Sequence, residues 1–224
     1  KLNEMLKSVS LADWKTYLKW RLAHEGAQYM SSSFEKENFS FYGTTMSGTK
    51  EMKPRWKRTL RTIDGTVGEA LGQIFVEKYF NADAKKRVNA MVDNLFASFK
   101  QRIETRDWMS AETKVKAAEK LGKITRKLGY PDKWKDYTAL TIKNDSYLNN
   151  VIRASTFACN EMLGYIGKPV DKSKWGMSPP TVNAYYNPPN NEIVFPAGIM
   201  QPPFFNPDAD DAFNYGVMGA VIGH

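Results

Sequence analysis

The side chains that most often bind metals or act as nucleophiles are scarce in this sequence. Its 224 residues include two histidines and one cysteine. His24 lies late in a predicted helix, beside Glu25 and Gly26, where a position near an exposed helix end is favoured over metal binding. Cys159 lies in an apolar helical stretch, where we expect a small buried side chain. The single cysteine excludes an internal disulfide. A metal site with two histidine ligands would need both histidines or ligands from outside this chain.

His224 ends an apolar helical pattern that begins near Asp208 and continues through Phe213, Val217 and Val221. A lone histidine on an apolar helix is more often structural than a ligand. A continuation as Glu-x-x-His would change this interpretation, because two histidines one turn apart can hold zinc while the glutamate acts as general base. Since the pattern has no stop signal, we expect the chain to be a fragment that ends at a functional residue.

A β-hairpin is predicted before this helix. Residues 182–186 are aromatic and β-prone, residues 187–191 form a turn, and residues 193–195 return as a second strand. The flanking prolines favour an edge position, because proline lacks the donor for a ladder hydrogen bond. An exposed edge can bind an extended peptide through main-chain hydrogen bonds. The pattern alone favours an ordinary structural hairpin over such a binding edge.

Helices account for the rest of the predicted structure. Apolar residues recur at helical spacing over about 1–30, 54–63, 66–80, 83–106, 110–128 and 145–166. Gly68, Ala70 and Gly72 indicate that the helix over 66–80 packs closely against a neighbour. From Lys168 the composition shifts to proline, asparagine and glycine, and the helical period disappears. We therefore place a domain boundary near 168–180.

Composition narrows the classes of function. A hydrophobic content of 42% indicates a folded globular protein, and no apolar run approaches the roughly 18 residues that span a bilayer. The net charge of +8 is compatible with a nucleic-acid partner. The basic residues are spread over several helices without a nucleic-acid-binding motif, so solvated helix faces are the better explanation.

Several segments together resemble the neprilysin family of zinc metallopeptidases, and within it the bacterial oligopeptidase O branch. Their order along the whole chain carries the resemblance more than any one of them. The segments are Trp14-Lys-Thr-Tyr-Leu-Lys-Trp20, Phe39-Ser-Phe-Tyr-Gly43, Arg55-Trp-Lys-Arg58, Asp107-Trp-Met-Ser-Ala-Glu-Thr113, Leu128-Gly-Tyr-Pro131, Asn183-Ala-Tyr-Tyr186, Ile193-Val-Phe-Pro-Ala-Gly198 and Val221-Ile-Gly-His224.

The resemblance implies a mainly α fold and a set of site residues. Residues 1–167 would form a multi-helix domain that restricts access to short peptides. Residues 168–224 would begin a thermolysin-like catalytic domain, with the β-hairpin and the start of its active-site helix. Asn183 and Ala184 match the edge-strand pair that holds the substrate main chain, and Tyr185 matches the next position. His224 matches the first zinc ligand.

The same resemblance implies a zinc endopeptidase that hydrolyses short peptides. The general-base glutamate and the other zinc ligands would lie beyond residue 224, so we expect this chain alone to be inactive. The remainder of the catalytic domain or a second copy would cover residues 182–224. The single cysteine favours a bacterial source, and the family favours a periplasmic or cell-envelope location. The alternative is a stand-alone helical peptide-binding module that uses the edge over 182–195; a nucleic-acid binder is a weaker third.

Overall fold

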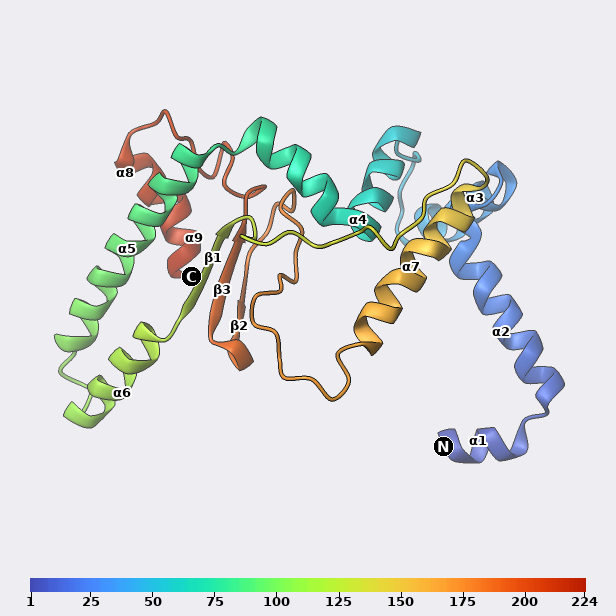
Figure 1. Ribbon diagram of the computed structural model, residues 1–224, viewed down its shortest axis with the longest axis horizontal. Helices are drawn as coiled ribbons and strands as arrows, with labels where there is room; N and C mark the ends of the chain where they lie inside the picture. Colours follow the sequence, from blue (N-terminus) through green and yellow to red (C-terminus); the bar gives the residue numbers. More distant parts are fainter. The chain divides into compact units, whose positions relative to one another are not determined.

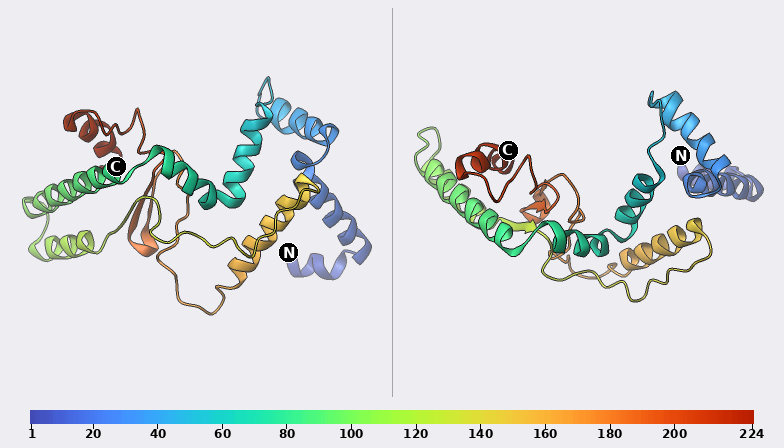
Figure 2. Two further views of the ribbon diagram at one scale, coloured as in Figure 1. Left: turned by 45° about the horizontal axis from the view of Figure 1, so that its top comes forward. Right: turned by 90° about the horizontal axis from the view of Figure 1, so that it is seen from above.

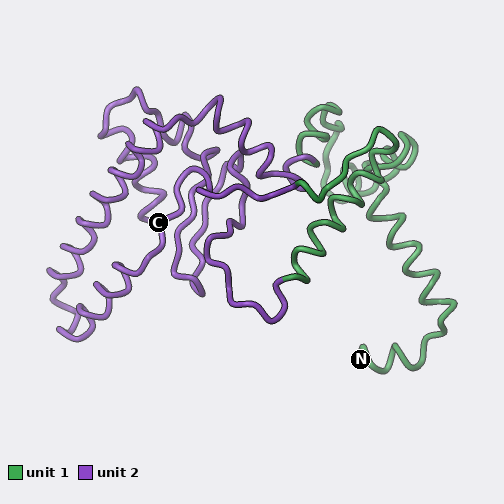
Figure 3. Tube along the Cα trace, viewed as in Figure 1, with its two compact units in different colours: residues 1–62, 138–164 green, residues 63–137, 165–224 purple.

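The computed structural model describes residues 1–224, which form two compact units (Figure 3). Unit 1 contains residues 1–62 and 138–164, and unit 2 contains residues 63–137 and 165–224. The helix α4 (Arg55–Tyr79) contributes residues to both, and its helical course is interrupted at Val67, where φ is −129° and ψ is 40°. No helix in the chain combines the length and the apolar character that a membrane span requires.

The regular secondary structure of unit 1 is all helical (Figure 1). Besides the first part of α4, unit 1 contains α1 (Leu2–Ser8), α2 (Leu11–Gly26), the 3-10 turn η1 (Ala27–Tyr29), α3 (Ser32–Asn38), the π-helical η2 (Phe39–Met46) and α7 (Tyr147–Leu163). Ser10 caps the beginning of α2, because its hydroxyl accepts the amide of Asp13 at 3.1 Å and donates to the Asp13 carboxylate at 2.7 Å.

The apolar stripe predicted on α2 lies mostly on the surface of unit 1. Leu11 and Leu22 are 70% and 69% exposed. Cys159 on α7 is also exposed, contrary to the burial that we expected. The only buried residue of α7 is Ala154, so its apolar positions do not form a core within this unit. An apolar sequence context predicts burial only where another element supplies the covering surface.

Unit 2 combines a small mixed sheet with helices (Figure 1). The sheet order is β1-β3-β2, with β1 parallel and β2 antiparallel to β3. Its elements after α4 are α5 (Ala82–Glu104), α6 (Ala111–Gly122), β1 (Thr125–Gly129), β2 (Tyr185–Asn187), the 3-10 turn η3 (Pro188–Asn190), β3 (Glu192–Pro196), α8 (Asp211–Asn214), the π-helical η4 (Tyr215–Gly219) and α9 (Ala220–Gly223).

The predicted helix over 110–128 is too long at its carboxyl end. The helix α6 ends at Gly122, and Thr125–Gly129 forms β1 instead. The amide of Lys123 closes the helix by bonding to the carbonyl of Glu119 at 3.2 Å. The strand then pairs with β3, from Thr125 opposite Glu192 to Gly129 opposite Pro196. The partner comes from much later in the chain, so local periodicity does not reveal the strand.

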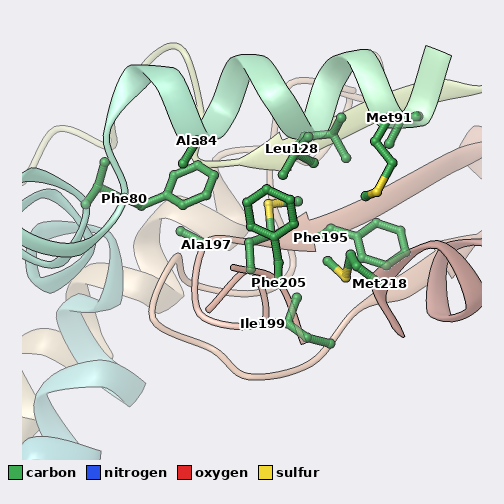
Figure 4. Packing of buried hydrophobic residues seen from close by; sticks show 13 residues of the cluster. Phe80, Ala84, Met91, Leu128, Phe195, Ala197, Ile199, Phe205 and Met218 are labelled. Atoms are coloured by element: carbon green, nitrogen blue, oxygen red, sulfur yellow. The ribbon is translucent and has the colours of Figure 1, made fainter. Parts of the chain in front are cut away.

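The core of unit 2 lies between α5, the sheet and the last helical segment (Figure 4). The helix α5 contacts both β1 and η4. Figure 2 shows α5 and α6 as an antiparallel pair beside the sheet. Buried side chains come from all of these elements: Ala84, Val88 and Met91 on α5, Leu128 on β1, Phe195 on β3, and Phe205 and Met218 after it.

This core corrects one expectation about residues 182–224. We expected their apolar faces to be uncovered without a further domain or a second copy. Val194 and Met218 are fully buried within unit 2, and Phe205 is 2% exposed. Phe205 and Met218 belong to the hydrophobic cluster that also contains side chains of α5 and β1, so unit 2 already covers them. Val182, Tyr186 and Phe213 remain on the surface.

Candidate functional site

The strand β2 lies at one edge of the sheet, as the sequence predicts. Its single strand neighbour is β3, with Tyr185 opposite Val194 and Asn187 opposite Glu192. The backbone groups on the other side of β2 have no strand partner. Such an edge can accept an extended segment as a further strand.

The predicted substrate-binding pair Asn183–Ala184 immediately precedes β2. Asn183 is exposed, and its side-chain oxygen accepts the amide of Ala184 at 2.8 Å. Ala184 is half-buried and packs against the core of unit 2. An incoming peptide would have to displace the Asn183 side chain to use the amide of Ala184. A peptide that bonds only to the neighbouring backbone carbonyls would leave the Asn183 side chain in place.

Tyr185 anchors the edge strand to the loop before it. Its hydroxyl accepts the amide of Gly176 at 2.8 Å. Burial raises the pKa of Tyr185 above 10.0, the hydrogen bond from Gly176 opposes this shift, and the negative charge of Glu192 adds to it. The phenol therefore stays neutral at physiological pH and serves as a hydrogen-bonding group.

A buried ion pair, which the sequence pattern does not predict, fixes the same hairpin. The Lys127 ammonium lies 2.8 Å from a carboxylate oxygen of Glu192, and the two side chains are 7% and 2% exposed. Lys127 also donates to the carbonyl of Lys174 at 2.7 Å. Asn187 and Asn190 donate to the other carboxylate oxygen of Glu192 at 3.0 and 3.3 Å. The pair therefore joins β1, β3, the turn and the loop before β2.

The pKa of Glu192 reflects these opposing influences. Burial would raise it, but the hydrogen bonds from Lys127, Asn187 and Asn190 outweigh burial and lower it below 4.5. The carboxylate is therefore ionised at neutral pH, as its lysine partner requires.

The turn between the strands is also tied to α6. Asn191 adopts a left-handed conformation, with φ of 48°, which asparagine tolerates better than most residues. Its side-chain nitrogen donates to the carbonyl of Lys120 at 3.1 Å, and its oxygen accepts the Tyr186 hydroxyl at 2.9 Å. These bonds hold the edge strand in one register.

His224, the predicted zinc ligand, follows α9. Asp210 caps the beginning of this helical run by accepting the amide of Ala212 at 2.7 Å. Val221 and Ile222 pack against the core of unit 2, while the His224 side chain is exposed. The same core therefore holds both this helical end and Ala184.

The residues present provide an incomplete donor set for zinc. The structure contains no cluster of three or more histidine, cysteine, aspartate or glutamate side chains that could hold a metal. An exposed imidazole can act as one ligand, but catalytic zinc sites use about three protein ligands. The other histidine, His24, belongs to unit 1. It accepts or donates a hydrogen bond with the Tyr42 hydroxyl at 3.0 Å and stacks on Trp20.

These features define a mainly helical protein whose small sheet presents an open edge strand, followed by a packed helix with a terminal imidazole. Two sequence-family models, both described as peptidase family M13, match the chain. One matches residues 1–131 and the other residues 183–224. The chain belongs to peptidase family M13. The family resemblance inferred from the sequence is thus confirmed, and so is the mainly α fold.

Similar proteins include metallopeptidases of animals and bacteria. The chain is 33% identical to an endothelin-converting enzyme homolog of Locusta migratoria and 33% identical to human neprilysin. Both matches cover 100% of the chain, but only 32% and 31% of those proteins. The chain therefore spans about a third of the length of these relatives.

Solved structures resemble the fold closely. The zinc metalloprotease Zmp1 of Mycobacterium tuberculosis, in complex with an inhibitor, gives a TM-score of 0.89 at 44% identity over 99% of the chain and 33% of its own. The protein PepO from Lactobacillus rhamnosis gives a TM-score of 0.83 at 32% identity, covering 90% of the chain and 32% of its own.

Proposed function

We propose that residues 1–224 belong to a zinc-dependent peptidase of short peptides, in which the edge of β2 binds substrate and His224 is a metal ligand. Membership of family M13 supports the class of reaction. The observation that carries the site assignment is the shared core: Ala184 beside the edge strand, and Val221 and Ile222 beside His224, pack against the same cluster.

The edge of β2 would bind the main chain of an extended peptide, with Asn183 and Ala184 as its pairing residues. Tyr185, whose hydroxyl accepts the amide of Gly176, would keep this edge in place. A zinc ion held in part by His224 would supply Lewis-acid chemistry at the scissile carbonyl and lower the pKa of water. The remaining ligands and the general base would come from outside residues 1–224, so these residues alone would not hydrolyse peptides.

The two parts of the sequence would have different roles in the peptidase. Residues 1–167 would contribute to a domain that restricts access, and residues 168–224 would open the catalytic domain. The compact units follow a different division, because residues 63–137 pack with residues 165–224. Helices α5 and α6 would therefore support the catalytic sheet as well as belong to the access-restricting part of the sequence. A bacterial source and a cell-envelope location remain predictions.

Replacing each histidine in the complete peptidase tests the metal assignment. We expect His224→Ala to remove bound zinc, measured by inductively coupled plasma spectrometry, and to abolish hydrolysis of a quenched fluorescent peptide. His24→Ala is the matched control and should keep its zinc, because His24 contacts Tyr42 and Trp20. A His224→Ala protein with full zinc content and activity would rule out the assignment.

The open edge of β2 also supports a second candidate, a peptide-binding module that needs no metal. It predicts that residues 1–224 bind short extended peptides in the presence of EDTA. Isothermal titration calorimetry would measure this binding. Absence of heat at millimolar peptide, with the protein folded by circular dichroism, would eliminate the module as an independent function.

A further inference from the structure

Unit 2 contains a cavity of about 580 Å³ that none of the proposed peptide-binding or metal-binding residues lines. Its wall comes from the carboxyl-terminal part of α5, the α5–α6 connection, α6 and Tyr186 of β2. The volume falls in the range of about 300–1,000 Å³ that is typical of small-ligand sites. The cavity is therefore large enough to hold a ligand of its own.

The most deeply placed lining residues are aliphatic, and the most exposed ones are aromatic. Ile103 and Leu121 are each 6% exposed, whereas Trp108 is 75% and Phe99 is 56% exposed. An apolar group that binds here would remove this aromatic surface from water, which is favourable in proportion to the area covered. Exposed apolar patches bordered by polar side chains often mark ligand-binding grooves.

Three cationic side chains also line the cavity: Arg102, Arg106 and Lys120. No ion pair engages any of them, and no aspartate or glutamate is among the lining residues. Arg106 donates through Nε to the carbonyl of Arg102 at 3.2 Å, and the Lys120 ammonium lies 6.0 Å from the centre of the Tyr186 ring. The cavity is therefore apolar with a positively charged border.

This combination favours an aliphatic chain that carries one anionic head. An arginine binds a carboxylate through charge-assisted hydrogen bonds, which are roughly twice as strong as neutral ones. A purely apolar ligand would leave the three cations unused, and an inorganic anion would leave the aromatic surface exposed. A polar heterocycle would bury its ring nitrogens against Ile103 and Leu121 without hydrogen-bond partners, which is costly.

We propose that this cavity is a binding site for a fatty acid. The acyl chain lies against Ile103, Leu121 and Trp108, and its carboxylate pairs with the three cations at the border. Binding requires neither zinc nor a peptide at the edge of β2, so the site can fail or succeed independently of the proposed peptidase function. Membrane lipids also combine acyl chains with anionic heads, so the experiment has to separate a free fatty acid from a lipid surface.

Isothermal titration calorimetry of residues 1–224 in EDTA tests the site. The probes are sodium octanoate, sodium decanoate and 1-octanol, each kept below the concentration at which it aggregates. Decanoate should bind about tenfold more tightly than octanoate, because it buries two more methylene groups. Octanoate should bind about tenfold more tightly than 1-octanol, because only the acid pairs with the cations.

Two variants separate the charged and apolar parts of the site. The double variant Arg102→Gln/Arg106→Gln should lose the preference for acid over alcohol and keep the dependence on chain length. Ala117→Trp fills the cavity from α6 and should abolish binding of all three probes, with circular dichroism showing that the protein is folded. The matched control is Lys100→Gln/Lys116→Gln, which removes two exposed cations that do not line the cavity and should bind like the unmodified protein.

Equal binding of octanoate and decanoate, or an acid preference that persists in the arginine double variant, would overturn the proposal. So would binding to phosphatidylglycerol vesicles without binding of monomeric decanoate, which would assign this surface to a membrane instead. The complete peptidase in EDTA should show the same selectivity as residues 1–224. Absence of decanoate binding there would show that other residues occupy the cavity, and it would also overturn the proposal.

Discussion

At the scale of single residues, the pair Lys127–Glu192 determines how firmly the hairpin is held. Burying two charges is costly, and the pair is tolerated because each partner has further hydrogen bonds. Lys127 bonds to the loop at Lys174, and Glu192 receives two asparagine amides from the turn. Loss of one charge would leave the other buried without its counterion. The pair therefore stabilises the proposed substrate edge as much as it stabilises β1 and β3.

Replacing Glu192 with glutamine tests this role. We expect Glu192→Gln to lower the free energy of unfolding by about 3 kcal/mol, because the Lys127 ammonium stays buried without a negative partner. Urea denaturation of residues 1–224 would measure the change. Glu119→Gln is the control, since its pairs with Lys116 and Lys123 are on the surface and should contribute much less to stability. Equal effects of the two substitutions would contradict the argument.

The lowered pKa of Glu192 also predicts a pH dependence. Because its pKa in the folded state lies below the value of 4.5, the carboxylate contributes stability that is present above about pH 4.5. That stability is lost as the pH falls through the lowered pKa. We expect the unfolding free energy to decrease below about pH 4.5, and to decrease less steeply in Glu192→Gln. Urea midpoints at several acidic pH values would measure both slopes; parallel slopes would show that Glu192 does not titrate with folding.

Some site residues could be found from the sequence and others could not. The edge character of the hairpin follows from the prolines and asparagines around residues 182–191, which a central strand does not tolerate. Lys127 and Glu192 lie far apart in the chain, and each looks like an ordinary surface charge in its own segment. Only the register of β1 with β3 brings them to one side of the sheet.

At the scale of elements, the small residues of α4 pack against a segment that the sequence did not indicate. Its small residues predict close helix packing, and close packing is found, but the neighbour is a loop. A Cβ atom on Gly68 would lie 2.8 Å from Cβ of Ser178, and one on Gly72 would lie 2.7 Å from the ring of Pro179. Ser178 also donates to the Asp64 carboxylate at 2.6 Å. Periodicity located this helix but not the loop that packs against it.

Two glycine substitutions on α4 separate packing from helix propensity. Gly72→Ala should destabilise unit 2 by about 1–3 kcal/mol, because the rigid Pro179 ring occupies the space that the methyl group needs. Gly65→Ala on the same helix meets nothing within 4 Å, so it should stabilise by up to about 1 kcal/mol through helix propensity. Thermal unfolding of the two variants would give shifts of opposite sign. Stabilisation by both would mean that the loop moves aside freely.

At the scale of the whole molecule, the core makes distant segments of unit 2 depend on one another. Residues from α5, β1, β3 and η4 contribute to one hydrophobic cluster (Figure 4). The proposed substrate edge and the helix that carries His224 are both attached to it through Ala184, Val221 and Ile222. Neither can be repositioned without disturbing side chains of α5. The helical segment before residue 131 is therefore a structural part of the candidate site.

This coupling can be tested by removing one core side chain near the end of the chain. Met218 is fully buried, so Met218→Ala should lower the stability of unit 2 by about 2–5 kcal/mol, through lost burial and the cavity left behind. If the cluster unfolds as one unit, hydrogen exchange of α5, β1 and β3 amides should accelerate together, even though Met218 lies on η4. Phe213→Ala is the control, because Phe213 is 46% exposed and its loss should change exchange little. Acceleration confined to residues 211–223 would show instead that this segment opens on its own, and the shared core would then not be what positions His224.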